Sequence, residues 1–295
     1  MWKEASVSTG CKINTYLRIL GRRNDGFHEI RTLIHPVTRP SDTLHISPLS
    51  EGRGLALSCS DQALSGEENI LYRVYEAFAR ATGAHPDLEV YLEKEVPHGS
   101  GLGGASADAA AFLHYLQSGL PREARLSSPR LMRLAASVGS DIPFFLVGRT
   151  AWISGKGEIV QPSQASGLSR EKILIVCPSL QISTAWAYKA YDRENEERGG
   201  DLSALVLTKS AKGDSFRKDE QGPKYWCNDF ESVVFRSCPE LRLLKSEIFQ
   251  CGARAAVMSG SGSSLAVLPG EEEAWRHCMH LLNSKALPYF VSESS

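Results

Sequence analysis

Short apolar runs separated by polar turns occupy the first part of the chain. Residues 13–20, 29–37 and 43–46 are apolar or alternate between apolar and polar positions. Such runs are typical of β-strands, because successive side chains of a strand point to opposite faces of the sheet. The pattern therefore predicts a meander of strands between residues 5 and 60.

Helical periodicity then replaces the alternation. Apolar side chains recur three and four positions apart over residues 70–81, and the run ends before Gly83. This spacing predicts an amphipathic helix with a glycine at its end. An alternating strand at 88–96 and an alanine-rich helix at 105–117 follow, with a glycine-rich turn between them.

The remaining chain mixes helices and strands. Predicted helices cover residues 129–138, 184–191, 229–236, 240–250 and 271–282. Predicted strands cover residues 150–154, 173–177, 255–258, 265–268 and 289–291, and a turn is predicted at 139–143. Residues 193–224 are strongly polar, and the segment 193–223 predicts an exposed insertion. The pattern as a whole predicts an α+β protein.

Composition and charge restrict the class of partner. The chain has 295 residues, of which 42% are hydrophobic, and this supplies enough apolar material for a core without disulfide bonds. Its 33 basic and 34 acidic residues leave a net charge of −1. No overall field therefore attracts nucleic acid or a membrane surface, and an anionic ligand has to be bound locally.

The cysteines and the N-terminus predict a cytoplasmic protein. The seven cysteines are scattered, with no CxxC pair and no spacing typical of a zinc site, so reduced thiols are expected. No positively charged start is followed by an apolar core, and no stretch reaches the about 18 apolar residues that a membrane span needs.

The glycine-rich turn is the strongest candidate for ligand binding. Small residues placed where a strand leads into a helix let main-chain amides and the helix N-terminus bind a diphosphate or triphosphate. The alternative is a turn that only lets the helix pack closely on the sheet. The candidate nucleotide residues of this turn are Pro97, His98, Gly99, Ser100, Gly101, Leu102, Gly103, Gly104, Ala105, Ser106 and Ala107.

Three common nucleotide folds fit this turn poorly. Gly99, Gly101 and Gly104 satisfy GxGxxG, but the motif lies a third of the way along the chain and no ribose-binding acid follows in register. The chain also lacks GxxxxGK[ST] and the VAIK, HRD and DFG elements of protein kinases. A dinucleotide-dependent oxidoreductase stays an alternative, and it predicts binding of a nicotinamide cofactor.

Several motifs in order resemble one kinase family. The turn is similar to the PxGxGLGxSxA motif of the GHMP kinases, and residues 10–14 and 260–264 resemble that family's N-terminal and C-terminal motifs. Residues 21–29, 68–70, 139–145, 155–158 and 228–231 also agree, in the family's order. The chain is therefore identified as a member of the GHMP kinases. It resembles the branch that phosphorylates a cytidine-diphosphate-linked methylerythritol in non-mevalonate isoprenoid biosynthesis.

The resemblance implies a fold and a division of labour between domains. It implies the two-domain GHMP kinase fold, with an N-terminal domain like domain 2 of ribosomal protein S5 and a ferredoxin-like C-terminal domain. Residues 1–165 would form the ATP-binding domain and residues 166–295 the substrate-side domain, with the substrate in a cleft between them. A monomer or weak homodimer is expected.

The resemblance also implies two catalytic residues. Asp141 would act as general base or orient the acceptor hydroxyl. Lys12 would lie beside Asp141, position that carboxylate and stabilise charge on the phosphoryl group. Phosphoryl transfer passes through a loose transition state rich in negative charge, so alignment and nearby cations are the main requirements. The alternatives are a turn or helix-capping role for Asp141 and an exposed strand position for Lys12.

The remaining implied roles concern the two ligands. Phe27 and Tyr188 would stack on the cytosine, and the backbone or side chain of His28 would read its edge. Asn69 and Lys94 would lie near the nucleotide, which is ATP with magnesium (Mg2+). No metal ligand is assigned. The other implied substrate residues are Asn14, Thr184, Gly260, Ser261 and Gly262.

Some residues depart from the family pattern, and two other functions stay alternatives. Ala105 and Ala107 stand where the family often has glycine and serine, and Ile34 stands where phenylalanine is common in the substrate pocket. Another GHMP enzyme acting on a plain alcohol is one rival. A non-catalytic protein that senses nucleotide is another, because a fold does not establish a function.

Overall fold

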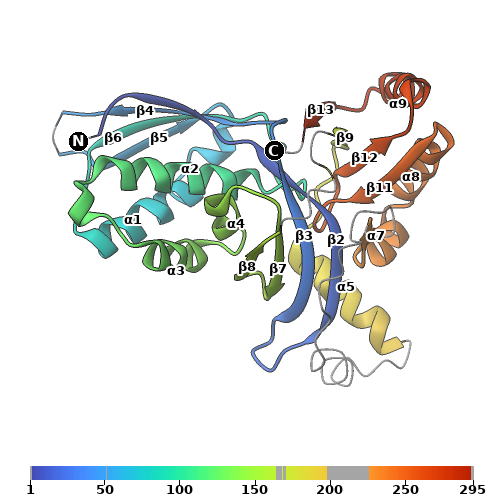
Figure 1. Ribbon diagram of the computed structural model, residues 1–295, viewed down its shortest axis with the longest axis horizontal. Helices are drawn as coiled ribbons and strands as arrows, with labels where there is room; N and C mark the ends of the chain where they lie inside the picture. Colours follow the sequence, from blue (N-terminus) through green and yellow to red (C-terminus); the bar gives the residue numbers. More distant parts are fainter. Residues whose placement is uncertain (1, 51, 164–167, 169–170, 198–225, 294–295) are drawn as a thin grey trace. The chain divides into compact units, whose positions relative to one another are not determined.

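The computed structural model describes residues 2–50, 52–163, 168, 171–197 and 226–293 (Figure 1). Most of the predicted polar insertion, from residue 198 onward, lies outside these residues. The chain divides into two compact units. Unit 1 comprises Met1–Cys11, Pro40–Pro97 and Gly103–Gly148, and unit 2 comprises Lys12–Arg39, His98–Leu102 and Arg149–Ser295. The boundary at residue 165 that the sequence suggested stays a prediction.

A four-stranded sheet with helices against one face forms unit 1 (Figure 1). Its strand order is β1 (Ala5–Ser8), β4 (Thr43–Pro48), β6 (Leu88–Glu93) and β5 (Leu55–Cys59). In this sheet β5 and β6 pair in parallel, whereas β4 pairs antiparallel with β1 and with β6. The helices are α1 (Ile70–Thr82), α2 (Gly104–Gly119), α3 (Ser128–Val138) and α4 (Ile142–Val147), with short 3₁₀ turns at Gln62–Leu64 and Arg122–Ala124.

The first helix shows how the sequence builds this unit. Leu71, Val74 and Phe78 are completely buried against the sheet, as the apolar spacing predicted. Asn69 caps the helix, because its side chain accepts a hydrogen bond from the amide of Leu71. Gly83 ends it in the left-handed conformation, with φ of 74°. The predicted helix and its glycine end are confirmed, and the structure adds the Asn69 cap.

Two sheets form unit 2. The first has the order β10 (Cys227–Asn228), β2 (Cys11–Arg22), β3 (His28–Val37), β7 (Ala151–Gly155) and β8 (Ile159–Pro162). The second has the order β11 (Ala253–Met258), β12 (Leu265–Pro269), β9 (Lys172–Val176) and β13 (Tyr289–Glu293), and its strands are antiparallel. Its helices are α5 (Thr184–Glu197), α7 (Glu231–Ser237), α8 (Pro239–Gln250) and α9 (Glu272–Ser284).

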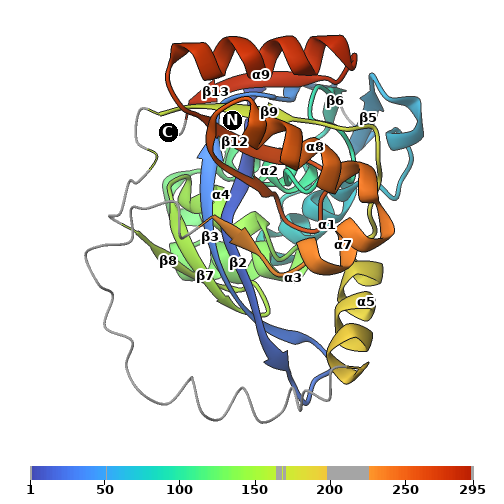
Figure 2. The same cartoon turned by 90° about the vertical axis from the view of Figure 1, so that its right-hand side faces the viewer.

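Helices α8 and α9 cover the second sheet (Figure 2). Ile248 of α8 and Cys278 and Leu282 of α9 are completely buried in one core with Val267 of β12. Residues 173–176 of β9 are completely buried, as expected for a central strand with both faces covered. The continuous apolar run of β9 in the sequence is therefore explained.

The predicted helices and strands are confirmed, but the meander expected between residues 5 and 60 is wrong, because β1, β4 and β5 belong to one sheet and β2 and β3 to another. One predicted turn also differs. The turn expected at 139–143 is cut short by α4, which begins at Ile142. Pro143 lies in the first turn of this helix, where its missing amide hydrogen costs no intrahelical bond. The sequence prediction included this proline in the turn.

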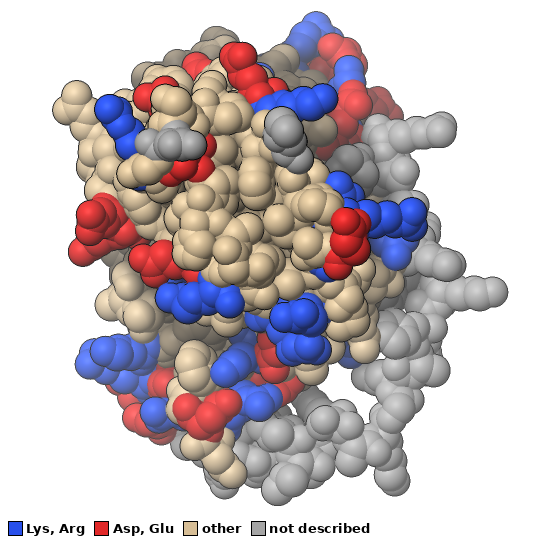
Figure 3. Space-filling view, turned by 90° about the vertical axis from the view of Figure 1, so that its left-hand side faces the viewer, with Lys and Arg blue, Asp and Glu red and all other residues tan. Residues whose placement is uncertain are grey.

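Charged groups are interspersed on the face shown in Figure 3. Lysine and arginine side chains alternate with acidic ones around a broad uncharged area of the described surface. This view agrees with the near-zero net charge of the chain.

A buried histidine makes the stability of unit 2 depend on pH. The ring of His35 bonds the hydroxyl groups of Thr15, at 2.9 Å, and Thr150, at 3.1 Å. Burial lowers the pKa of His35 to about 4. The neutral ring is therefore the folded form, whereas an unfolded chain would bind a proton near pH 6.5. Stability from this group is complete above pH 6.5 and is lost as the pH falls toward 4.

We expect the free energy of unfolding to fall by about 2 kcal/mol more between pH 7 and pH 5 in the wild type than in His35→Gln. Urea unfolding at both pH values measures the difference. His85→Gln is the matched control, since His85 is exposed, and it should keep the wild-type dependence. Equal pH dependence of the wild type and His35→Gln would contradict the assignment.

Candidate active site

The glycine-rich turn joins β6 to α2 through three residues in the left-handed region. Gly99, Gly101 and Gly103 have φ values of 67°, 80° and 72°. Side chains are strained in this region, so these positions need glycine. Gly103 is the N-cap of α2, which begins at Gly104, and a helix start leaves amide groups without intrahelical partners. The turn has the backbone geometry that phosphate binding requires.

A second glycine turn packs against the first. It follows β11, and the amide of Gly262 donates to the carbonyl of Ser259 at 2.9 Å. A Cβ atom added to Gly101 would lie 2.1 Å from the same carbonyl oxygen, and one added to Gly260 would lie 3.2 Å from the carbonyl oxygen of Gly101. The amide of Ser264 also donates to the carbonyl of Ser100 at 3.1 Å. The two turns therefore meet backbone to backbone within unit 2.

Lys12 is buried beside these two turns. Only 4% of the residue is exposed, and its Nζ atom donates to Asn14 Oδ1 and to the carbonyl of Gly101, both at 2.6 Å. Ser259 Oγ donates to the same Gly101 carbonyl at 2.9 Å and accepts from the amide of Asn14 at 3.2 Å. An exposed strand position for Lys12 is thereby excluded. The structure brings Lys12, Asn14 and both glycine motifs together.

Two residues without an assigned role hold the second glycine turn. Asn228 is buried, and its Nδ2 atom donates to the carbonyls of Met258 and Gly260, both at 2.7 Å. Ser259 is completely buried and bonds the first turn. The sequence placed Asn228 in a family-like segment but offered no sign of these contacts, since its partners lie 30 residues or more along the chain.

The predicted substrate residues Thr184, His28 and Tyr188 lie along α5 and the start of β3. Thr184 Oγ1 is 2.8 Å from Ser261 Oγ, which ties α5 to the second glycine turn. The rings of His28 and Tyr188 are stacked, with centroids 4.5 Å apart and planes 17° apart. Phe27 is 55% exposed, and Lys156 Nζ lies 4.5 Å from the centre of its ring. The base clamp formed by Phe27 and Tyr188 stays a prediction.

Lys94 lies in a buried ion-pair network of unit 1. Its Nζ atom bonds Asp42 and, at 2.9 Å, Asp108 Oδ2. The Oδ1 atom of Asp42 also accepts from the amides of Glu95, at 2.6 Å, and Val96, at 2.8 Å. This network fixes the chain directly before the glycine-rich turn. Asn69, the other predicted nucleotide residue of this unit, caps α1.

The network shifts the pKa values of Asp108 and Lys94. Burial raises the pKa of Asp108 to about 7, and Asp42 adds to this effect while Lys94 opposes it. Burial alone would lower the pKa of Lys94, but the carboxylates of Asp108 and Asp42 raise it. Lys94 therefore stays charged, and it is shared by two acids that compete for it.

Asp141 is the residue immediately before α4. It is half-buried, and its side chain makes no capping hydrogen bond to the helix. The capping role considered from the sequence is therefore not observed. Asp141 belongs to unit 1 and Lys12 to unit 2, so their expected proximity stays a prediction.

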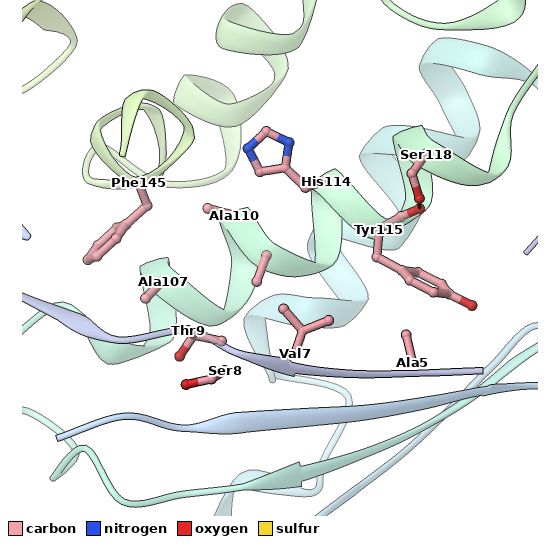
Figure 4. Close-up of a pocket in the computed structure, with 11 residues that line it drawn as sticks. Ala5, Val7, Ser8, Thr9, Ala107, Ala110, His114, Tyr115, Ser118 and Phe145 are labelled. Carbon is pink, nitrogen blue, oxygen red and sulfur yellow. Dashed lines mark hydrogen bonds between the residues drawn. The ribbon is translucent and has the colours of Figure 1, made fainter. Parts of the chain in front are cut away.

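An apolar cavity of about 510 Å³ lies within unit 1 between β1 and α2 (Figure 4). Small side chains of α2, such as Ala107 and Ala110, leave this space opposite Val7 of β1. Ala107 is the only predicted nucleotide residue that lines it. Its mostly apolar lining does not suit phosphate groups.

Comparisons with known proteins decide the family. The model for the N-terminal domain of GHMP kinases matches residues 69–149, and the model for their C-terminal domain matches residues 220–276. The chain is 42% identical over 264 residues to the 4-diphosphocytidyl-2-C-methyl-D-erythritol kinase of Nitratidesulfovibrio vulgaris, with 89% of each chain covered. The same enzyme of Lawsonia intracellularis is 41% identical, with 88% of this chain and 87% of that protein covered.

The chain belongs to the GHMP kinase family. It is therefore an ATP-dependent kinase with the predicted two-domain α+β fold. A crystal structure of 4-(cytidine 5'-diphospho)-2C-methyl-D-erythritol kinase is similar with a TM-score of 0.77 and 30% identity, covering 99% of this chain and all of that one. The mevalonate kinase of Methanococcus jannaschii, at 14% identity and a TM-score of 0.67 over 99% of both chains, shares the fold.

Among the described residues of this GHMP kinase, no three His, Cys, Asp or Glu side chains are grouped so that they could hold a metal ion. Magnesium in kinases is commonly held by substrate phosphates, water and one or two carboxylates, so a larger protein cage is not required. Within the same described part of the chain, no helix combines the length and the apolar character that crossing a bilayer needs.

We expect Gly101→Ala to weaken ATP binding at least about tenfold, which corresponds to about 1.4 kcal/mol. The added methyl group would overlap the Ser259 carbonyl and displace the turn. Calorimetric titration with magnesium and ATP measures the effect, and thermal unfolding reports whether the variant is folded. Gly66→Ala is the matched control, because nothing lies within 4 Å of its added Cβ atom. Wild-type affinity of a folded Gly101→Ala protein would contradict the role of this contact.

Proposed function

We propose that this kinase transfers the γ-phosphoryl group of ATP to the 2-hydroxyl of 4-diphosphocytidyl-2-C-methyl-D-erythritol. The acceptor oxygen forms a bond to the γ-phosphorus, the bond from that phosphorus to the bridging oxygen breaks, and ADP leaves. The hydroxyl proton passes to a base. The relatives named as kinases of this substrate match 88–89% of the chain at 41–42% identity. This similarity supports the assignment.

The contacts of Lys12 with Asn14 and Gly101 are the main structural support for the proposal. The Lys12 ammonium group is held by Asn14 and Gly101 beside the turn whose amides suit phosphate binding. The loose transition state of phosphoryl transfer carries negative charge on the transferred group. A cation that is already fixed in place stabilises this charge without a reorganisation step. Magnesium bound with ATP would add further positive charge.

Asp141 is the proposed base or orienting group for the acceptor hydroxyl. Its carboxylate is not engaged in capping α4, which supports a role toward a ligand. A positioned carboxylate within hydrogen-bonding distance of the reacting hydroxyl is what general base catalysis needs.

The cytidine part of the substrate would bind at Phe27, His28 and Tyr188. The exposed ring of Phe27 offers apolar area for stacking, and an aromatic ring pair is well suited to a nucleobase. The product would serve isoprenoid biosynthesis. We expect the enzyme to act in the cytoplasm as a monomer or weak homodimer.

We expect Asp141→Asn to lower turnover at least about a hundredfold and to leave ATP affinity within about twofold of the wild type, because the amide cannot accept the proton. ADP release with the cytidylated substrate measures turnover, and calorimetry measures ATP binding. Glu123→Gln, an exposed change in the same unit, should behave as the wild type. Turnover of Asp141→Asn within a few fold of the wild type would exclude the proposed role.

The choice of acceptor is tested in the same assay. We expect rapid ADP release with 4-diphosphocytidyl-2-C-methyl-D-erythritol and none above background with mevalonate, homoserine or 2-C-methylerythritol 4-phosphate. Plain alcohols lack the base that the aromatic residues would bind. Equal rates with a plain alcohol would favour another GHMP activity, and tight ATP binding without any transfer would favour a nucleotide sensor.

A further inference from the structure

One face of α5 carries three polar or aromatic residues at helical spacing. Thr184, Tyr188 and Asp192 are each four positions apart, so they lie along the same side of the helix. Thr184 bonds Ser261 of the second glycine turn, and the other two residues contact the same side chain, His28. This α5 face therefore connects the glycine turn to the first residue of β3.

Two different contacts fix the ring of His28. Its face stacks on Tyr188, and its Nε2 atom lies 2.7 Å from Asp192 Oδ1. Both side chains of this pair are largely buried, with 7% of His28 and 16% of Asp192 exposed. The stacking sets the plane of the ring, and the bond to Asp192 sets its rotation within that plane. Few other orientations satisfy both contacts.

Tyr188 is itself held in place. Phe230 lies edge-on to its ring, with centroids 4.8 Å apart and planes 82° apart, and only 2% of Phe230 is exposed. The stack of His28 on Tyr188 thus rests on the core of unit 2. Asp192 supplies the polar part of this arrangement.

The bond to Asp192 also decides which ring nitrogen is available to a ligand. A carboxylate accepts hydrogen bonds, so Nε2 of His28 carries a hydrogen atom and donates it. Nδ1 is then the ring nitrogen left to pair with another group. A carboxylate that orients a histidine in this way is a common supporting arrangement at binding and catalytic sites.

We propose that Asp192 is a positioning residue for the nucleobase: it holds the His28 ring so that Nδ1 is presented to the Watson–Crick edge of the cytosine. This inference rests on the proposed function, in which His28 reads the base. Asp192 acts through His28 and touches neither the ATP nor the reacting hydroxyl. Its loss should therefore affect substrate affinity and leave the chemical step intact.

The first test compares Asp192→Ala with Glu196→Ala, an exposed acid one turn further along α5. We expect Asp192→Ala to raise KM for the cytidylated substrate about tenfold or more, with kcat and KM for ATP within about twofold of the wild type. Calorimetric titration with cytidine 5'-diphosphate should show the same loss of affinity. Glu196→Ala should match the wild type in each measurement.

The second test asks whether Asp192 acts through His28. A double-mutant cycle with His28→Ala should show that Asp192→Ala has little further effect once the ring is absent. Proton NMR should show a slowly exchanging Nε2 hydrogen of His28 in the wild type that exchanges rapidly in Asp192→Ala. The NMR signal reports whether the bond between Asp192 and His28 forms in solution, and the cycle reports whether the loss of affinity acts through the His28 ring. A merely structural role would not confine the effect to KM for the cytidylated substrate.

The inference fails if folded Asp192→Ala binds cytidine 5'-diphosphate as the wild type does, or if its effect adds to that of His28→Ala. It also fails if kcat falls while KM is unchanged. Failure of the proposed function is distinguishable, because the wild type itself would then neither bind cytidine 5'-diphosphate nor phosphorylate the cytidylated substrate.

Discussion

The hydrogen bond from the Lys12 ammonium to the carbonyl of Gly101 is the contact on which the proposed site depends. Burying an ammonium group is costly unless oxygen atoms replace the water that it loses. Asn14 and Gly101 provide such atoms, and Ser259 bonds the same carbonyl from the second glycine turn. One main-chain oxygen thus joins β2 and both glycine turns. The lack of a Cβ atom at Gly101 is what lets the two turns approach.

Two further sets of hydrogen bonds hold the backbone next to these turns. Asn228 binds the carbonyls of the second turn, and Asp42 binds the amides just before the first turn. Asp42 belongs to unit 1 and pairs with Lys94, so the predicted nucleotide residue Lys94 has a structural partner of opposite charge. Buried side chains of Asn228 and Asp42 therefore hold the backbone beside both glycine turns in place.

The sequence predicted much of the fold because local patterns determine it. The spacing of Leu71, Val74 and Phe78, with Gly83 after them, specified a helix and its end. Helix α4 was missed because residues 139–143 were predicted as a turn, whereas Pro143 fits the first turn of a helix. For the site, ordered family motifs predicted Lys12, Asn14 and both turns. Ser259 and Asp192 were not predicted, because their partners lie 158 to 245 residues away in the chain.

The central claim is that the first glycine turn and Lys12 bind the phosphates of ATP. The most direct measurement is a crystal structure with magnesium and a non-hydrolysable ATP analogue. The account predicts β- and γ-phosphate oxygens within hydrogen-bonding distance of main-chain amides between residues 99 and 106, with Lys12 Nζ in contact with the γ-phosphate. Phosphates bound elsewhere, with the turn and Lys12 free of nucleotide, would contradict it.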